Sequence, residues 1–217
     1  ILKQPTQPIA ARKPNRSFVH GLITNKKALV GMIVMLVFIA LALLAPVLFP
    51  GDPSRITAMA SLEPSPEHWL GTTAKGQDVL ALTAHGSRSS LFVGLTVGVA
   101  STFVGILVGL ASAYFGKFID EALSLVTNVF LLLPGLPLLV ILAAFLPPGL
   151  GTVILVLVVT GWAGSARVLR SQALSIRSKD FVAAAVVSGE RAGRIMFREI
   201  LPNMASIVMG TLLACII

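Results

Sequence analysis

The 217-residue chain is much more apolar than a soluble domain. Hydrophobic residues make up 55% of it and charged residues only 12%, against about 25% charged in an average soluble domain, and the mean hydropathy is +0.90. These figures exclude a water-soluble domain and predict an all-α protein that crosses a membrane several times. The single cysteine, Cys215, excludes an internal disulfide framework, and we interpret it as a packing residue in an apolar run.

Apolar runs define the expected spans, because a helix needs about 20 apolar residues to cross the hydrocarbon core. The runs predict spans at 28–49, 91–115, 122–147 and 148–166, and the start of a fifth at 203–217. Between them lie a basic N-terminal arm at 1–27, a loop at 50–90 and a second loop at 167–202. Since the chain stops inside an apolar run, we expect it to be part of a longer protein.

Lys and Arg predict the orientation, because they concentrate on the cytoplasmic side of membrane proteins. A cytoplasmic N-terminus places fourteen of the seventeen Lys and Arg residues on the cytoplasmic side, and only Arg55, Lys75 and Arg88 on the external side. The inside set is Lys3, Arg12, Lys13, Arg16, Lys26, Lys27, Lys117, Arg167, Arg170, Arg177, Lys179, Arg191, Arg194 and Arg198. The net charge of +8 therefore reflects topology, and we expect no nucleic-acid partner, since no basic patch is interleaved with aromatic residues. The loop at 50–90 is then external, with a short amphipathic helix expected from Gln77 to His85.

The second expected span carries small residues four positions apart, a spacing that puts them on one helix face and lets two backbones approach closely. These residues are Gly94, Gly98, Ser101, Gly105, Gly109 and Ala113. We expect them to pack against other helices, either in a fixed bundle or as a sliding surface.

The third expected span contains Pro134 and Pro137, which remove two backbone donors and should kink or break the helix. A broken helix can line a transport pathway, although a kink can equally serve only to fit the bundle. Thr127 and Asn128 are the main polar groups of this span, and all four residues are candidates for the pathway.

The spans lack Asp, Glu, Lys, Arg and His. Proton-driven carriers usually place an ionisable residue at mid-membrane, and an intramembrane hydrolase needs a nucleophile with a base, so we expect neither class. No metal-ligand spacing occurs, and Gln77 and Asp78 stand where a phosphate-binding loop needs Lys and Ser or Thr. We therefore expect no enzyme, no metal and no cofactor in this chain.

The segment DFVAAAVVSGERAGRIMFREILPN, residues 180–203, predicts two short helices on the cytoplasmic side. Asp180 is a good N-cap, Gly189 suits the position after a helix, and a second helix could run from Glu190 to Ile200. Pro202 fits the first turn of the fifth span. Such a hairpin can pack on its own bundle or enter a groove of another protein.

The same segment resembles the signature loop of ABC importer permeases. The family's spacing is Ala-Ala, three residues, Gly, nine residues, two further positions and then Leu-Pro. This chain follows it with Ala184-Ala185, Gly189 and Leu201-Pro202. Ala183 stands where the family usually has Glu, and Glu199 stands at its Ile position. The resemblance assigns the contact with the ATPase to Phe181, Val182, Ala183, Ala184, Ala185, Gly189, Glu190, Arg191, Glu199, Leu201 and Pro202.

The external segment HWLGTTAKGQDVLALTAHGSRSSLFVG resembles the second permease subunit of dipeptide, oligopeptide and nickel importers. The matching positions are His68, Leu70, Gly71, Thr72, Gly76, Asp78, Gly86, Arg88, Ser90 and Leu91, with Gln77 in place of the usual Arg.

This resemblance implies a type I importer permease fold of six spans, about four and a half of them present, in a bacterial or archaeal inner membrane. It implies a second similar permease, two ATPase subunits that bind ATP and Mg²⁺, and an extracytoplasmic substrate-binding protein. The implied cargo is a dipeptide or oligopeptide, with oligosaccharides or nickel as alternatives. A membrane scaffold whose insert merely binds a partner is the alternative from another class.

Overall fold

The computed structural model describes residues 25–56 and 59–217, so Lys3, Arg12, Lys13 and Arg16 of the expected arm lie outside the described residues. The chain divides into two units, Ile1–Arg88 and Ser89–Ile217. The described residues are helical apart from loops and one isolated bridge between Thr72 and Asp78, which confirms the all-α fold class.

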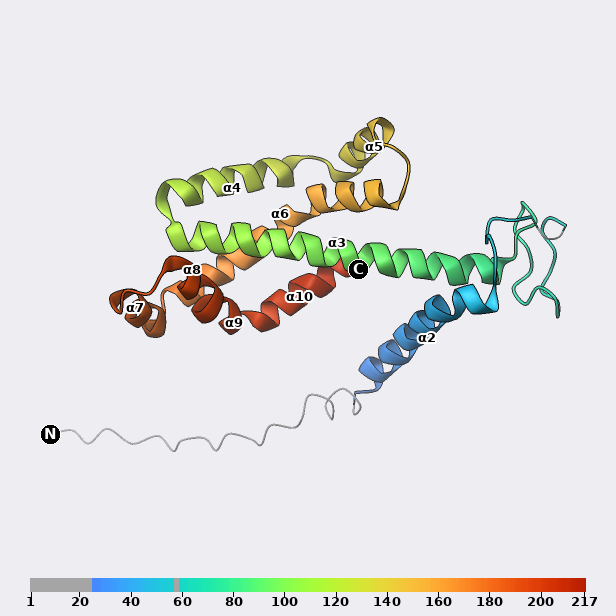
Figure 1. Ribbon diagram of the computed structural model, residues 1–217, viewed down its shortest axis with the longest axis horizontal. Helices are drawn as coiled ribbons and strands as arrows, with labels where there is room; N and C mark the ends of the chain where they lie inside the picture. The colour runs from blue at the N-terminus through green and yellow to red at the C-terminus, as the bar shows by residue number, and fades with distance from the viewer. Residues whose placement is uncertain (1–24, 57–58) are drawn as a thin grey trace. The chain divides into compact units, whose positions relative to one another are not determined.

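The helices follow one another with short connections (Figure 1). They are α2 (Lys26–Leu48), α3 (Val79–Phe115), α4 (Lys117–Leu132), α5 (Gly135–Phe145), α6 (Leu150–Arg177), α7 (Asp180–Val187), α8 (Ala192–Arg194), the π-helix η1 (Ile195–Ile200), α9 (Leu201–Asn203) and α10 (Ala205–Ile216). Among the described residues α2, α3 and α6 are long and apolar enough to cross a membrane, and the number rises to five if each of two bent helix pairs is one span.

The first unit contains α2, the loop between α2 and α3, and the start of α3. The Asn25 side chain caps α2 by accepting a hydrogen bond from the Lys27 amide at 3.1 Å. In the loop, the Thr72 hydroxyl donates to the Met59 carbonyl at 2.7 Å and accepts from the Leu62 amide at 2.9 Å. These bonds tie together parts of the loop that are at least ten residues apart in sequence.

The expected separate helix from Gln77 to His85 is wrong in its extent, because α3 begins at Val79 and continues without a break to Phe115. Gly86 alone does not interrupt it, since one glycine weakens a helix by only about 1 kcal/mol. The Thr83 and Ser87 hydroxyls donate to carbonyls four residues earlier, at 2.8 and 2.7 Å, and so satisfy themselves within the helix.

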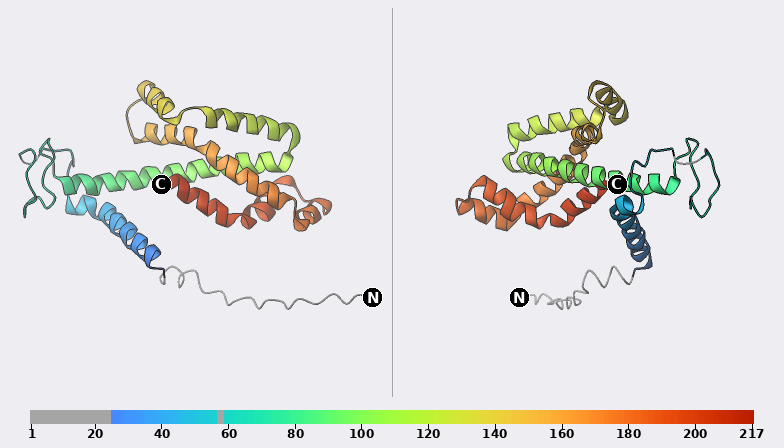
Figure 2. Two further views of the ribbon diagram at one scale, coloured as in Figure 1. Left: turned by 180° about the vertical axis from the view of Figure 1, so that it is seen from behind. Right: turned by 45° about the vertical axis from the view of Figure 1, so that its right-hand side comes forward.

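The second unit is a bundle in which α4 and α5 lie along α6, and α10 lies along another part of α6 (Figures 1 and 2). Close backbone approach between α3 and α6 depends on glycine. A Cβ at Gly105 would lie 2.6 Å from the Ser165 Cβ, and one at Gly109 would lie 2.9 Å from the Ala166 carbonyl oxygen. Gly94 and Gly98 approach Ile216 of α10 in the same way. The last two residues of this expected packing set, Ser101 and Ala113, are buried on the same helix.

The core of the second unit gathers side chains from α3, α6, α7, η1 and the turn before α10. Its fully buried members are Leu110, Ala113, Leu169, Ala173, Val182, Ile195, Ile200 and Met204. The core therefore joins the membrane helices to the segment at 180–203.

The helix of the third expected span breaks where prolines were expected to break it. α4 ends at Leu132, α5 begins at Gly135, and the two helices meet at 86°. Pro134 precedes α5 and has no amide hydrogen to continue the hydrogen-bond ladder of α4. Pro137 lies in the first turn of α5, where a missing amide donor costs little.

The segment at 180–203 differs from the sequence prediction in three details. Asp180 is the first residue of α7 rather than its N-cap, which is Lys179, because the backbone turns helical one residue earlier than the side-chain preference indicates. The second helix is not regular: α8 passes into the π-helix η1 and then α9.

The third difference concerns Pro202, which lies in α9 rather than in the first turn of the fifth span. The chain bends by 77° between α9 and α10, and α10 begins only at Ala205. The buried Met204 side chain holds the bend against the core.

Candidate functional site

The turn after α7 is fixed by backbone geometry. Gly189 has φ +75°, its amide donates to the Val186 carbonyl at 3.0 Å, and the Glu190 amide donates to the Ala185 carbonyl at 3.2 Å. This pair of bonds is the Schellman motif, which ends a helix on a residue in the left-handed conformation. The position therefore requires glycine for its backbone, and the turn sends the chain back toward the core.

α7 has one buried side and one exposed side. Val182 is 2% exposed and packs in the core, whereas Val187 is 88% exposed and Phe181 and Val186 are also exposed. We call Phe181, Val186 and Val187 the α7 apolar surface. Three large apolar side chains on so short a helix are typical of a surface that another protein covers.

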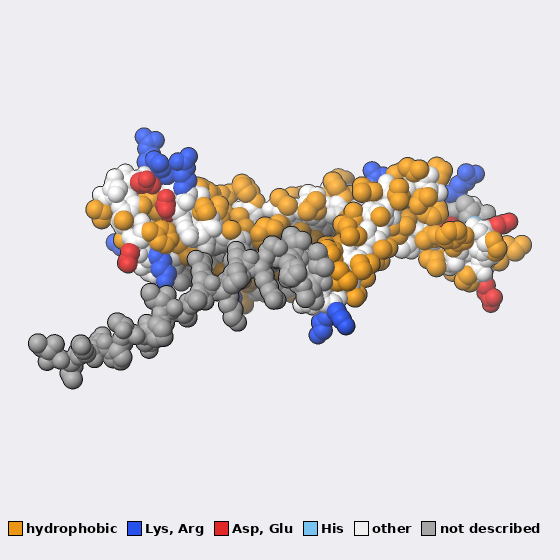
Figure 3. Space-filling model, turned by 90° about the horizontal axis from the view of Figure 1, so that it is seen from below, with side chains coloured by type: hydrophobic (Ala, Val, Ile, Leu, Met, Phe, Trp, Pro, Cys, Tyr) orange, Lys and Arg blue, Asp and Glu red, His pale blue; other side chains and the backbone are white. Residues whose placement is uncertain are grey.

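The other residues assigned to this region by sequence lie around α7. Ala183, Ala184, Arg191 and Pro202 are exposed, Ala185, Glu190, Glu199 and Leu201 are half-buried, and Ala185 and Leu201 pack against the core. Glu190 faces Arg194 with 3.6 Å between Oε1 and Nε, and its other carboxylate oxygen is buried without a partner among the described residues. Figure 3 shows Lys and Arg side chains gathered at the end that carries α7.

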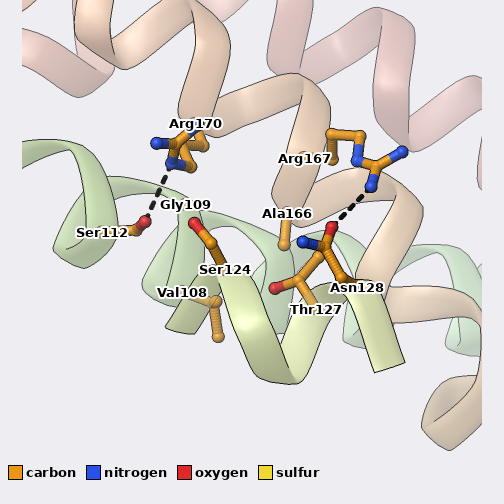
Figure 4. Close-up of a pocket in the computed structure, with 9 residues that line it drawn as sticks. All are labelled: Val108, Gly109, Ser112, Ser124, Thr127, Asn128, Ala166, Arg167 and Arg170. Atoms are coloured by element: carbon orange, nitrogen blue, oxygen red, sulfur yellow. Dashed lines mark hydrogen bonds between the residues drawn. The ribbon is translucent and has the colours of Figure 1, made fainter. Parts of the chain in front are cut away.

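A second site, which we call the α3–α4–α6 pocket, is a cavity of about 420 Å³ (Figure 4). Its lining residues are Val108, Gly109 and Ser112 from α3, Ser124, Thr127 and Asn128 from α4, and Ala166, Arg167 and Arg170 from α6. Two of the pathway candidates, Thr127 and Asn128, thus meet in one pocket. The other two, Pro134 and Pro137, do not line it.

Charged groups hold this pocket together. Arg170 forms two charge-assisted hydrogen bonds to Asp120 in the first turn of α4, from Nε to Oδ1 at 2.6 Å and from Nη2 to Oδ2 at 2.7 Å. The Ser112 hydroxyl donates to Asp120 and accepts from Arg170 Nε at 3.1 Å. Arg167 donates from Nη2 to the Asn128 Oδ1 at 2.6 Å.

Sequence reasoning missed Arg167, Arg170, Asp120 and Ser112 as site residues. It treated the charged ones only as indicators of topology. The three-residue spacing of Arg167 and Arg170 on one helix face was an available signal. Their partners, however, lie 39 and 50 residues away in sequence, and only the fold brings them close.

In the loop between α2 and α3, two residues of the segment that resembles the importer permeases meet. His68 Nδ1 donates to Asp78 Oδ2 at 2.7 Å. Partial burial would raise the pKa of Asp78, but the hydrogen bonds from His68 and from the Ala81 and Leu80 amides outweigh it and hold that pKa below its ordinary value. Within the described residues no three His, Cys, Asp or Glu side chains come together as a metal site.

Comparison with known proteins gives two family matches and several relatives. Residues 101–217 match the family "binding-protein-dependent transport system inner membrane component", and residues 14–64 match "N-terminal TM domain of oligopeptide transport permease C". The oligopeptide transport system permease protein OppC of Bacillus subtilis (strain 168) is 32% identical over 190 residues, which cover 87% of this chain and 62% of OppC.

Two dipeptide permeases are similar at the same level. The dipeptide transport system permease protein DppC of Bacillus subtilis (strain 168) is 34% identical over 206 residues, 92% of this chain and 64% of DppC. DppC of Alkalihalophilus pseudofirmus is 33% identical over 211 residues, 96% of this chain and 69% of that protein. The chain thus spans less than two thirds of the length of the two Bacillus relatives.

These matches confirm the resemblance to importer permeases that was inferred from residues 180–203 and from the segment that begins at His68. The first family match covers more than half of the chain, and the second is specific to the C-type subunit of oligopeptide permeases. The chain is a multi-pass membrane protein, and it belongs to the family of inner membrane components of binding-protein-dependent transport systems.

Proposed function

We propose that this chain is a permease subunit of an ATP-driven importer of dipeptides or oligopeptides. It would form half of the translocation pathway, and a second, similar permease would form the other half. The names of its relatives support peptides as cargo and do not favour the oligosaccharide or nickel alternatives.

The observation that carries this proposal is the α7 apolar surface. Val182 fixes α7 on a core shared with α3 and α6, while Phe181, Val186 and Val187 point away from that core. A partner ATPase that covers these side chains could therefore push or pull on two membrane helices. ATP and Mg²⁺ would bind to two such ATPase subunits, and an extracytoplasmic binding protein would deliver the peptide.

A charge added to the α7 apolar surface tests this coupling. Val187→Asp should abolish co-purification of the ATPases and peptide uptake, because a carboxylate would be buried without a partner in the interface. Ser175→Asp adds the same charge at an exposed position of α6 and should leave both intact. Normal assembly and uptake with Val187→Asp would contradict the proposal.

The scaffold alternative and the sugar alternative give different results in the same cells. A scaffold would bind a partner without changing its ATP hydrolysis, so hydrolysis in the assembled complex should be measured with and without the peptide-loaded binding protein. The cargo is tested by offering labelled peptides and labelled oligosaccharides in competition. If deletion of the gene abolished only oligosaccharide uptake, the cargo would be an oligosaccharide and not a peptide.

The proposed topology places the N-terminus and α7 in the cytoplasm of a bacterial or archaeal cell. The distribution of Lys and Arg supports it. A cysteine introduced as Ser175→Cys, at an exposed position of α6 outside the α7 apolar surface, should react with an impermeant maleimide in inverted vesicles but not in intact cells. Labelling of intact cells would show that the topology is the opposite of the one proposed.

A further inference from the structure

The α3–α4–α6 pocket carries an unbalanced positive charge. Its two guanidinium groups belong to Arg167 and Arg170, and Arg170 is neutralised by the two-point contact with Asp120. Arg167 contacts only the neutral Asn128 amide, and within the described residues no carboxylate lies within ion-pair distance of it. None of the residues that line the pocket is acidic.

Donor groups remain for a ligand. Asn128 uses its carbonyl oxygen to accept from Arg167, so its amide nitrogen keeps both hydrogens for another acceptor. Arg167 is exposed and has further N–H groups in the fixed planar arrangement that suits a phosphate. The Thr127 hydroxyl is already committed to the Leu123 carbonyl at 2.7 Å. The pocket thus presents donors and one net positive charge to an anion.

The depth of Arg167 corresponds to the edge of the hydrocarbon core. Residues 150–166 of α6 carry no charge and span roughly 25 Å at 1.5 Å per residue, close to the thickness of that core. Arg167 is the first charged residue after this stretch. We therefore expect its guanidinium at the level of the lipid headgroups, in the leaflet on the α7 side.

The surface of α4 beside the pocket suits acyl chains. Leu125, Val129 and Leu132 share one helix face by their spacing and are all exposed. Asn128 comes three residues after Leu125 and four before Leu132, so it borders that face and also bonds to Arg167. A molecule with a phosphate at Arg167 could continue along an apolar surface.

We propose that the α3–α4–α6 pocket binds the phosphate of an anionic phospholipid through Arg167 and Asn128, with an acyl chain along the exposed face of α4. An anionic headgroup such as phosphatidylglycerol suits the pocket better than phosphatidylcholine. The single net positive charge matches the phosphate, and no free carboxylate among the lining residues would receive a choline group.

Native mass spectrometry of the assembled permease, with phosphatidylglycerol and phosphatidylcholine offered in equal amounts, tests this site. Wild-type protein should retain phosphatidylglycerol preferentially. Arg167→Gln should weaken that retention about tenfold, as expected for loss of one charge-assisted contact. Asn128→Leu, which keeps the charge but loses the amide donor, should weaken it less. The control Lys179→Gln removes an equal charge from an exposed residue outside the pocket and should retain lipid like the wild type.

Three outcomes would overturn the proposal. The first is equal retention by Arg167→Gln and wild type. The second is displacement of the lipid by inorganic phosphate, which would make the pocket a site for free anions. The third is displacement by a dipeptide, which would make it part of the peptide pathway. Because lipid retention does not require transport, the result is independent of the cargo and of the ATPase contact.

Discussion

Arg170 on α6 donates two hydrogen bonds to the Asp120 carboxylate on α4, at 2.6 and 2.7 Å. Asp120 also accepts from the Ser112 hydroxyl of α3 and from the Ser124 hydroxyl at 3.2 Å. One carboxylate thus ties together three helices: α3 and α4, which Gly116 joins, and α6, whose Arg170 lies 50 residues further along the chain. Because both side chains are half-buried, with 34% of the Arg170 and 22% of the Asp120 side chain exposed, solvent screens this pair less than a fully exposed pair.

Removing the guanidinium should loosen the bundle. Arg170→Met leaves Asp120 with only hydroxyl donors in a half-buried place, and we expect the full-length protein to lose about 1–3 kcal/mol of stability. Thermal unfolding in detergent measures the loss. Glu121→Gln removes a neighbouring exposed carboxylate and should change the melting temperature little. An unchanged melting temperature for Arg170→Met would show that the ion pair does not hold α4 to α6.

The close approach of α3 to α6 should tolerate no added methyl group. A Cβ at Gly109 would lie 2.9 Å from two backbone atoms, the Ala166 oxygen and the Arg170 nitrogen. Gly109→Ala should therefore force the helices apart and cost about 1–3 kcal/mol. Gly164→Ala is the matched control: a Cβ there meets nothing within 4 Å, and alanine favours the helix by about 1 kcal/mol. Equal melting temperatures of the two variants would contradict a glycine-dependent contact.

Substitutions at Gly189 should distinguish the cost of backbone strain from the cost of side-chain bulk. A Cβ at Gly189 meets nothing within 4 Å, but φ is +75°, so the cost of a substitution depends on the backbone. Gly189→Val should destabilise the turn by about 1–2 kcal/mol, whereas Gly189→Asn should cost less, because Asn tolerates this conformation. Hydrogen exchange of the α7 amides measures the effect.

Those two variants also test the contact with the ATPase. If only the turn matters, Gly189→Asn should keep ATPase binding and Gly189→Val should weaken it. Loss of binding with both variants and unchanged amide exchange would instead show that the partner approaches Gly189 too closely for any side chain.

Local features of the fold could be read from the sequence, and long-range ones could not. Gly189 ends α7, and the helix breaks at Pro134, because each depends on the backbone of a few neighbouring residues. Pro202 was placed wrongly because the buried Met204, rather than the proline, decides where α10 begins. The partners Arg167–Asn128 and Arg170–Asp120 are set by tertiary packing, which the spacing of charges along the chain does not show.

The stability of the loop between α2 and α3 should depend on pH through Asp78. Its pKa is lowered in the folded protein, so ionised Asp78 stabilises the loop at a pH above the unfolded value of 3.8, and this contribution is lost as the pH falls through the lower folded pKa. Asp78→Asn removes the negative charge beside His68 while keeping an amide oxygen as acceptor, and it should lower loop stability at a pH above the unfolded value of 3.8. The difference from wild type should shrink below about pH 4.

Hydrogen exchange of the amides at 68–78, followed against pH, measures this difference. Glu63→Gln, an exposed carboxylate of the same loop, should follow the wild-type curve. A difference between Asp78→Asn and wild type that stays constant down to pH values well below the unfolded pKa would mean that the His68 contact does not depend on the charge of Asp78. The loop would then be held mainly by Thr72 and its hydrogen bonds to the Met59 carbonyl and the Leu62 amide, and the charge of Asp78 would contribute nothing.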